Sequence, residues 1–214
     1  GRNQEKEKLD KILRSNQAEF LALYGRRRVG KTFLIRQYLK EKIIFDLSGT
    51  KEGTKKQQLN NFFSEYLSRT QGKQQTVAPN SWQEAFHYLA TYLTSLPPTD
   101  SKYVVFLDEM PWMDTPRSEF IGALEFFWNQ HVSRMENMLL IACGSASSWI
   151  RKNLINARGG LYNRVTHRIK LAPFNLYETE LYLRSIGVNL PLYQVLELYM
   201  VMGGVPFYLK ESEK

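Results

Sequence analysis

The sequence contains little cysteine and no long apolar run, and both absences narrow its class. Cys143 is the single cysteine in 214 residues, which excludes an intrachain disulfide and a cysteine zinc cluster. The longest apolar runs, such as residues 138–143, are far too short to span a bilayer. No basic and then apolar signal peptide opens the chain. We therefore expect a cytoplasmic protein without a membrane partner and, since the chain does not begin with Met, part of a longer protein.

Acidic residues are outnumbered by basic ones, and the two kinds are segregated along the chain. Lys and Arg total 29 against 21 Asp and Glu, a formal net charge of +8. Residues 1–50 and 151–214 carry the basic excess, whereas residues 101–150 hold more acids than bases. Residues 151–170 contain basic side chains and no acidic one. This net charge favours a polyanionic partner but does not identify it.

Short apolar runs separated by amphipathic segments predict an α/β fold. Strands are expected at 18–24, 43–47, 102–107, 138–143 and 165–171, and helices at 1–15, 32–41 and about 55–68. A capping box at Ser81 and Glu84 predicts another helix start, and Thr115 followed by Pro116 predicts a cap with proline at the first helical position. Alternating strands and helices indicate a mostly parallel sheet covered on both faces, a three-layer architecture.

The strand signal disappears after residue 173. Asn175 and Glu178 form a second capping box, which predicts the start of a purely helical tail. We therefore predict an α/β domain at 1–172 and a small helical domain at 173–214.

Residues 25–32 (GRRRVGKT) fit the pattern G-x-x-x-x-G-K-[ST]. The glycines let the backbone wrap closely around a phosphate chain, and the helix that follows presents its positive dipole end to the same charge. Lys31 can reach the β- and γ-phosphates, and the Thr32 hydroxyl can ligate Mg²⁺. The predicted nucleotide-binding residues of this loop are Gly25, Arg26, Arg27, Arg28, Val29, Gly30, Lys31, Thr32 and Phe33.

Two further strand ends carry candidate catalytic side chains. Asp108 and Glu109 end an apolar strand, where the first carboxylate suits the Mg²⁺ shell and the second suits the activation of water. Ser145 follows the next strand and could contact the γ-phosphate or cap a helix. In residues 151–170, Arg164 and then Arg158 are candidates for an arginine that stabilises the transition state, although a solvated loop or a nucleic-acid contact also fits. GTP-binding proteins carry one signature motif after the third strand and another after a later strand. Both motifs are missing here, which favours ATP over GTP as the nucleotide.

These motifs together resemble those of the archaeal-type P-loop ATPases, a branch close to the AAA+ and STAND ATPases. The similarity covers nearly the whole chain. Its motifs are Gly1-Arg2 with Glu5 and Leu9, the loop at 23–32, residues 108–111 (DEMP), Gly144-Ser145, residues 161–164 (LYNR) and residues 203–209 (GGVPFYL). Asn163 replaces the glycine that this family usually has before Arg164.

The resemblance implies a P-loop domain with a helical lid that carries out Mg²⁺-dependent ATP hydrolysis. It places Arg2 near the adenine, Pro206 against the nucleotide, Thr32 and Asp108 on Mg²⁺, and makes Lys31, Glu109, Ser145 and Arg164 catalytic. An arginine that acts in trans would require a homo-oligomer. Family members often continue into winged-helix and nuclease-like domains, which would lie beyond residue 214 and could bind DNA.

Other functions remain open from the sequence. A nucleotide switch that holds ADP without turnover would carry the same motifs. A small-molecule phosphotransferase is disfavoured by Glu109, and a DNA-binding module by the lack of a helix-turn-helix pattern.

Overall fold

A five-stranded parallel sheet forms the centre of the molecule. The structure, a computed structural model, describes residues 1–72, 75–156, 161 and 163–213. The strands are β1 (Glu19–Tyr24), β2 (Ile43–Ser48), β3 (Tyr103–Asp108), β4 (Met138–Gly144) and β5 (His167–Lys170). Their order is β2-β3-β4-β1-β5, and every neighbouring pair is parallel. All carboxyl ends therefore meet at one edge, and the predicted parallel α/β sheet is confirmed.

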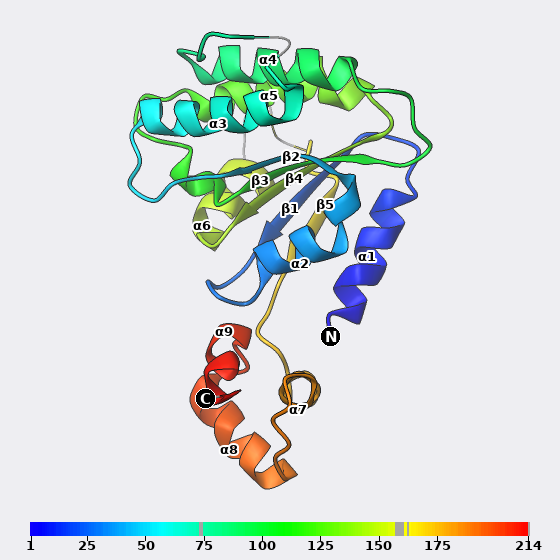
Figure 1. Cartoon of the computed structure of the whole chain (residues 1–214), viewed down its shortest axis with the longest axis vertical. Helices are drawn as coiled ribbons and strands as arrows, with labels where there is room; N and C mark the ends of the chain where they lie inside the picture. The colour runs from blue at the N-terminus through cyan, green and yellow to red at the C-terminus, as the bar shows by residue number, and fades with distance from the viewer. Residues whose placement is uncertain (73–74, 157–160, 162, 214) are drawn as a thin grey trace.

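Helices cover both faces of this sheet (Figure 1). Helices α1 (Asn3–Leu13) and α2 (Lys31–Tyr38) lie on one face, and α3 (Lys55–Thr70), α4 (Trp82–Thr94) and α5 (Phe120–Gln130) on the other. Leu9 and Ile35 pack with Leu21 of β1 in one core, whereas Phe62 and Phe127 pack with Phe20 in the other. Neighbouring residues of β1 thus enter opposite cores, which is why the strands read as continuous apolar runs.

The remaining turns are short. They are η1 (Lys40–Lys42), η2 (Met110–Trp112), η3 (Val132–Arg134), α6 (Ser147–Ile150), the π-helical η4 (Arg151–Ile155) and η5 (Lys210–Glu213). Among the described residues, no helix is both long and apolar enough to cross a membrane.

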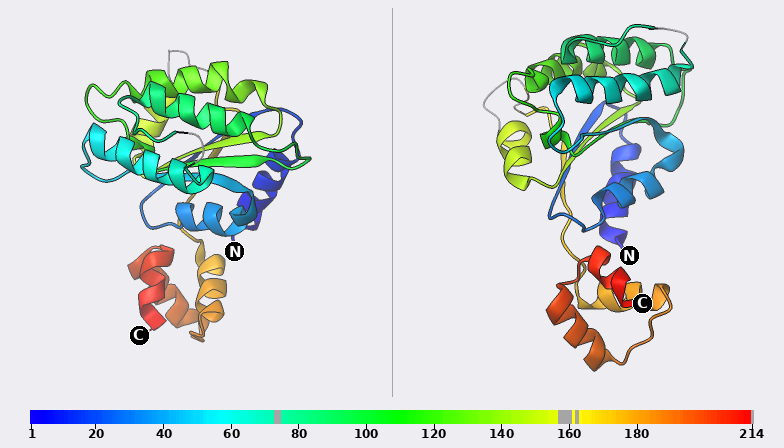
Figure 2. Two further views of the ribbon diagram at one scale, coloured as in Figure 1. Left: turned by 45° about the horizontal axis from the view of Figure 1, so that its top comes forward. Right: turned by 60° about the vertical axis from the view of Figure 1, so that its left-hand side comes forward.

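Residues 173–213 form a helical segment with its own small apolar cluster. Its helices are α7 (Leu176–Ser185), α8 (Leu192–Met202) and α9 (Pro206–Leu209). The buried cluster consists of Phe174, Leu183, Val195 and Leu209. The capping box at Asn175 and Glu178 is confirmed, because each side chain accepts the other's backbone N–H. Both views in Figure 2 place this segment beside the N-terminal end of α1.

The predicted start of α5 differs from the structure. Helix α5 begins at Phe120 rather than at Pro116, because Arg117 and Glu119 both adopt a left-handed φ of 59° that breaks helical continuity. The Thr115 hydroxyl is buried and finds no partner among the described residues, so it does not cap a helix.

The capping box predicted at α4 is only half formed. Ser81 accepts the Glu84 backbone N–H at 3.1 Å, as expected. The Glu84 carboxylate instead accepts the N–H of Asn80, one residue further back, at 2.8 Å.

Candidate functional site

The phosphate-loop motif lies between the end of β1 and the start of α2. Gly25 directly follows β1 with a φ of 152°. A Cβ at Gly25 would lie 2.2 Å from the carbonyl oxygen of Leu171, which follows β5. Gly30 precedes α2 with a φ of 92°. Glycine adopts both conformations without the steric cost that another residue would incur.

The substitution Gly25→Ala is expected to lower the free energy of unfolding by about 1–3 kcal/mol, because the methyl group must displace backbone. The measurement is a urea unfolding curve. Gly122→Ala is the matched control, since Gly122 lies within α5 and a Cβ there meets no atom within 4 Å. Alanine at that helical position should stabilise by about 0.5–1 kcal/mol. Equal stability of Gly25→Ala and the wild type would contradict the steric argument.

Lys31 begins α2, and its side chain folds back over the loop. The residue is only 5% exposed. Its Nζ donates to the carbonyl oxygens of Gly25 at 3.1 Å and Arg26 at 3.0 Å. An ammonium group has three N–H donors, so one remains beyond these two bonds. The lysine is thus held with its charge inside the loop that would surround a phosphate.

The other side chains predicted from this loop are mostly exposed. Arg26, Arg27 and Arg28 are exposed, whereas Val29 is buried. The guanidinium of Arg27 lies 6.0 Å from the ring centre of Trp112. Phe33 points away from the sheet with 71% of its surface exposed, so its side chain takes no part in these contacts.

Thr32 and Asp108 bring together two oxygen groups from α2 and β3. The Thr32 hydroxyl donates to Oδ2 of Asp108 at 2.7 Å. Asp108 is buried at the carboxyl end of β3. Hydroxyl and carboxylate oxygens are hard ligands of the kind Mg²⁺ prefers, and Mg²⁺ commonly takes only one or two of them besides phosphate and water. The pair therefore fits the predicted metal site.

Glu109 and Ser145 meet across the ends of β3 and β4. The hydroxyl of Ser145 donates to Oε2 of Glu109 at 2.9 Å, and its backbone N–H donates to the same oxygen at 3.2 Å. Glu109 has a left-handed φ of 47°, and its backbone N–H donates to Asp108 Oδ1 at 3.0 Å. A non-glycine residue in this conformation costs about 1–3 kcal/mol and needs support from its surroundings.

Gln58 supplies part of that support, and the sequence reasoning missed it. Its Nε2 donates to the carbonyl oxygens of Thr50 at 2.7 Å and Trp112 at 3.0 Å, and its Oε1 accepts the Thr50 N–H. The Trp112 N–H in turn donates to the Glu109 carbonyl. Gln58 is 1% exposed and lies four residues before Phe62 on the buried stripe of α3. A polar residue on an otherwise mostly apolar helix face is the sequence signal that could have identified Gln58.

Arg2 connects the start of the chain to the loop. Its Nη2 donates to the Val29 carbonyl at 3.0 Å, and its guanidinium lies 4.5 Å from the ring centre of Phe174. Burial lowers the pKa of Arg2, whereas Glu5 and Glu178 raise it. Pro206, the other residue predicted to contact nucleotide, is half-buried at the start of α9.

Among the described contacts, Arg164 has none with the carboxylates of Asp108 and Glu109. Its side chain is exposed, and the contacts of the described residues include none between it and Lys31 or Glu109. Asn163 has a left-handed φ of 58°, a conformation that asparagine tolerates nearly as glycine does. Arg158, the second candidate, lies outside the described residues.

Cys143 is part of the core. It is fully buried in β4. Burial raises the pKa of the Cys143 thiol well above its usual value, and Asp108 raises it further. The thiol is therefore protonated at neutral pH and is a poor nucleophile. In the described ranges, no three His, Cys, Asp or Glu side chains group as a metal site.

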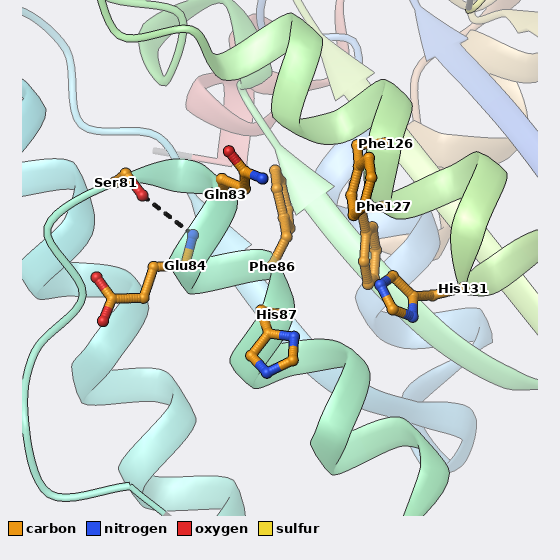
Figure 3. A pocket seen from close by; sticks show the side chains of 8 residues that line it. All are labelled: Ser81, Gln83, Glu84, Phe86, His87, Phe126, Phe127 and His131. Carbon is orange, nitrogen blue, oxygen red and sulfur yellow. Dashed lines mark hydrogen bonds between the residues drawn. The ribbon is translucent and has the colours of Figure 1, made fainter.

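A separate hollow of about 420 Å³ opens between α4 and α5 (Figure 3). Three phenylalanine rings and two imidazoles are among the side chains that line it. The lining residues are Ser81, Gln83, Glu84, Phe86, His87, Phe126, Phe127 and His131. Burial lowers the pKa of His131, which keeps it neutral near pH 7. None of the predicted site residues lines this hollow.

Comparison with known proteins gives matches over the whole chain. A family profile for an ATPase domain predominantly from Archaea matches residues 1–212. An uncharacterized protein of Methanocaldococcus jannaschii is 24% identical over 98% of this chain and 43% of its own length.

Solved structures share the fold. The Walker-type ATPase of Pyrococcus abyssi is similar over 98% of this chain and 65% of that one, with a TM-score of 0.65 and 21% identity. The ORC2 protein of Aeropyrum pernix was solved in ADPNP-ADP complexes. Its similarity covers 86% of this chain and 50% of the ORC2 chain, with a TM-score of 0.59 and 17% identity. The chain spans less than two thirds of each of these proteins.

Proposed function

The chain belongs to the family of ATPase domains found predominantly in Archaea, and on this premise we propose that it binds ATP with Mg²⁺ and hydrolyses it. The resemblance drawn from the motifs is confirmed. The three-layer P-loop NTPase fold is confirmed as well, since the P. abyssi ATPase and A. pernix ORC2 share it. Complexes of ORC2 with ADPNP and ADP support a nucleotide at the corresponding loop here.

One observation carries the proposal, namely the side chains that gather at the carboxyl edge of the sheet. Lys31 lies within the loop, the Thr32 hydroxyl bonds Asp108, and Ser145 bonds Glu109. These residues come from α2 and from the ends of β3 and β4, which are adjacent in the sheet. A phosphate-binding cation, a metal-binding oxygen pair and a proton acceptor thus share one surface, as phosphoryl transfer to water requires.

In the proposed reaction the loop backbone and Lys31 hold the β- and γ-phosphates. Glu109 accepts a proton from the water whose oxygen attacks the γ-phosphorus. The bond from that phosphorus to the β–γ bridging oxygen breaks, and ADP and phosphate leave. Ser145 orients the Glu109 carboxylate and would contact the same water or the γ-phosphate. Arg164 would stabilise the transition state, from a second copy of the chain if it acts in trans.

Thr32 and Asp108 would hold Mg²⁺, and the metal would neutralise charge on the phosphates when bound.

Phosphate release from ATP by the purified protein tests the function directly. Removal of Mg²⁺ with excess EDTA is expected to lower turnover at least about 100-fold, because the charge of the β- and γ-oxygens is then unopposed. Restoring Mg²⁺ should restore activity. Turnover that persists without divalent cation would contradict the assignment of Thr32 and Asp108.

A switch that binds nucleotide without turnover is the second candidate. It is favoured by the Glu109–Ser145 contact, in which both Ser145 donors engage the oxygen that would accept the proton. Single-turnover measurement with bound ATP separates the two functions, because a switch would retain intact ATP for hours.

We also propose that residues 1–172 form the ATPase domain and residues 173–214 its lid. The separate apolar cluster of the helical segment supports that division. The output would belong to a DNA-binding or nuclease-like domain outside these residues; the chain spans 43% of the M. jannaschii relative.

A further inference from the structure

We propose that Arg28 is a positioning residue that ties the phosphate loop to the helical segment and slows nucleotide release. The inference rests on the function proposed above and concerns how the same site retains its nucleotide. It assigns a role to two aromatic residues of α9, Phe207 and Tyr208.

The contact joins residues that are 180 positions apart in the chain. Nη1 of Arg28 donates to the Tyr208 hydroxyl at 3.2 Å. The guanidinium carbon lies 4.3 Å from the ring centre of Phe207 and 5.4 Å from that of Tyr208. The two rings are nearly perpendicular, at 84°, with centres 5.7 Å apart. One cation is therefore in contact with both aromatic side chains of α9.

The backbone of Arg28 shows that this contact is coupled to the loop. Arg28 has a left-handed φ of 68°, a conformation that a non-glycine residue adopts only where its surroundings hold it. Its side chain reaches from the loop to α9. Movement of α9 would thus release the constraint on the backbone that surrounds the phosphates.

The next residue of the loop is joined to the same helical segment by a second arginine. The Val29 carbonyl accepts a hydrogen bond from Arg2, whose guanidinium lies over the ring of Phe174. The Phe174 N–H donates to the Gly204 carbonyl at 2.8 Å, just before α9. Two consecutive loop residues are therefore linked to the helical segment, Arg28 directly at α9 and Val29 through Arg2 at Phe174. The loop cannot open around a bound diphosphate without disturbing one of these contacts.

The chemistry of the contact requires arginine rather than any cation. A planar guanidinium stacks on aromatic rings and donates to a hydroxyl at the same time, whereas an ammonium group does so less well. Arg28→Lys keeps the positive charge near the phosphates and weakens the aromatic contact. Tyr208→Phe removes only the hydrogen bond, and Phe207→Leu removes one ring.

The first experiment measures dissociation of a fluorescent ADP analogue by stopped flow. The Phe207→Leu/Tyr208→Phe double variant is expected to release ADP about 5–20-fold faster than the wild type, as the loss of two exposed contacts predicts. The single-turnover rate of ATP hydrolysis should change less than about two-fold, because neither residue touches the reacting groups. Tyr193→Phe is the matched control, since Tyr193 lies on α8 with 70% of its surface exposed. Arg28→Lys should reproduce the faster release and add little to the double variant.

The second experiment needs no nucleotide. Cys143 is buried, so cysteines introduced by Asn60→Cys and Glu197→Cys can carry spin labels selectively. The distance distribution between the labels on α3 and α8 should broaden in the double variant. An unchanged distribution, or release within two-fold of the wild type, overturns the inference while leaving the proposed ATPase intact. A wild-type protein that binds no ADP overturns the proposed function and this inference with it.

Discussion

Replacing Lys31 with alanine is expected to weaken ATP binding by about 100-fold, which corresponds to about 2.7 kcal/mol. The buried ammonium group donates to two loop carbonyls and is the cation proposed to hold the phosphates. Its loss removes a charge-assisted hydrogen bond and leaves the Gly25 and Arg26 carbonyls without their donor. Both effects oppose the arrangement of the loop around an anion.

Isothermal titration with ATP and Mg²⁺ measures this effect. Lys40→Ala is the matched control, because Lys40 begins η1 just beyond α2, is exposed and carries the same charge. Its affinity for ATP should stay within about two-fold of the wild type, since exposed charges are largely screened by salt. Equal affinities of Lys31→Ala and the wild type would remove the loop from the binding site. A melting temperature for each variant separates lost binding from lost folding.

The loop and the central strands could be predicted from the sequence because their signals are local. The glycines at 25 and 30 adopt backbone conformations that the loop of eight residues requires. The runs at 102–107 and 138–143 are apolar because both faces of the sheet are covered by helices. Asp108 and Ser145 follow such runs, so parallel pairing alone brings them to one edge. Their contacts with Thr32 and Glu109 follow from that topology.

Other features depend on contacts that no local pattern contains. The predicted helix start at Pro116 is wrong because two left-handed residues, Arg117 and Glu119, delay α5 to Phe120. Such residues carry no sequence signal of their own, since neither is glycine or asparagine. The Gln58 side chain donates hydrogen bonds to the backbone carbonyls of Thr50 and Trp112. These two carbonyls come together only in the folded chain. The contact of Arg28 with Tyr208 likewise exists only once α9 is placed.

Replacing Glu109 with glutamine is expected to lower kcat by about 10²–10⁴-fold while ATP affinity changes little, because a positioned general base contributes about that factor. An amide cannot accept the proton of the attacking water. Its oxygen can still accept both hydrogen bonds from Ser145, so the left-handed turn that begins at Glu109 should persist. The variant should therefore accumulate bound ATP rather than fail to bind it.

Steady-state phosphate release and ATP titration together test this expectation, and Glu119→Gln supplies the control. Glu119 is exposed and has a left-handed φ of 59°, so the same substitution is made on a similar backbone away from the site. It should leave both kcat and affinity unchanged. If Glu109→Gln hydrolysed ATP at the wild-type rate, Glu109 would not be the proton acceptor. The Ser145 hydroxyl donates to the Glu109 carboxylate at 2.9 Å, so a different position of that oxygen would cost this hydrogen bond. A fully active variant would then require a proton acceptor other than the Glu109 carboxylate.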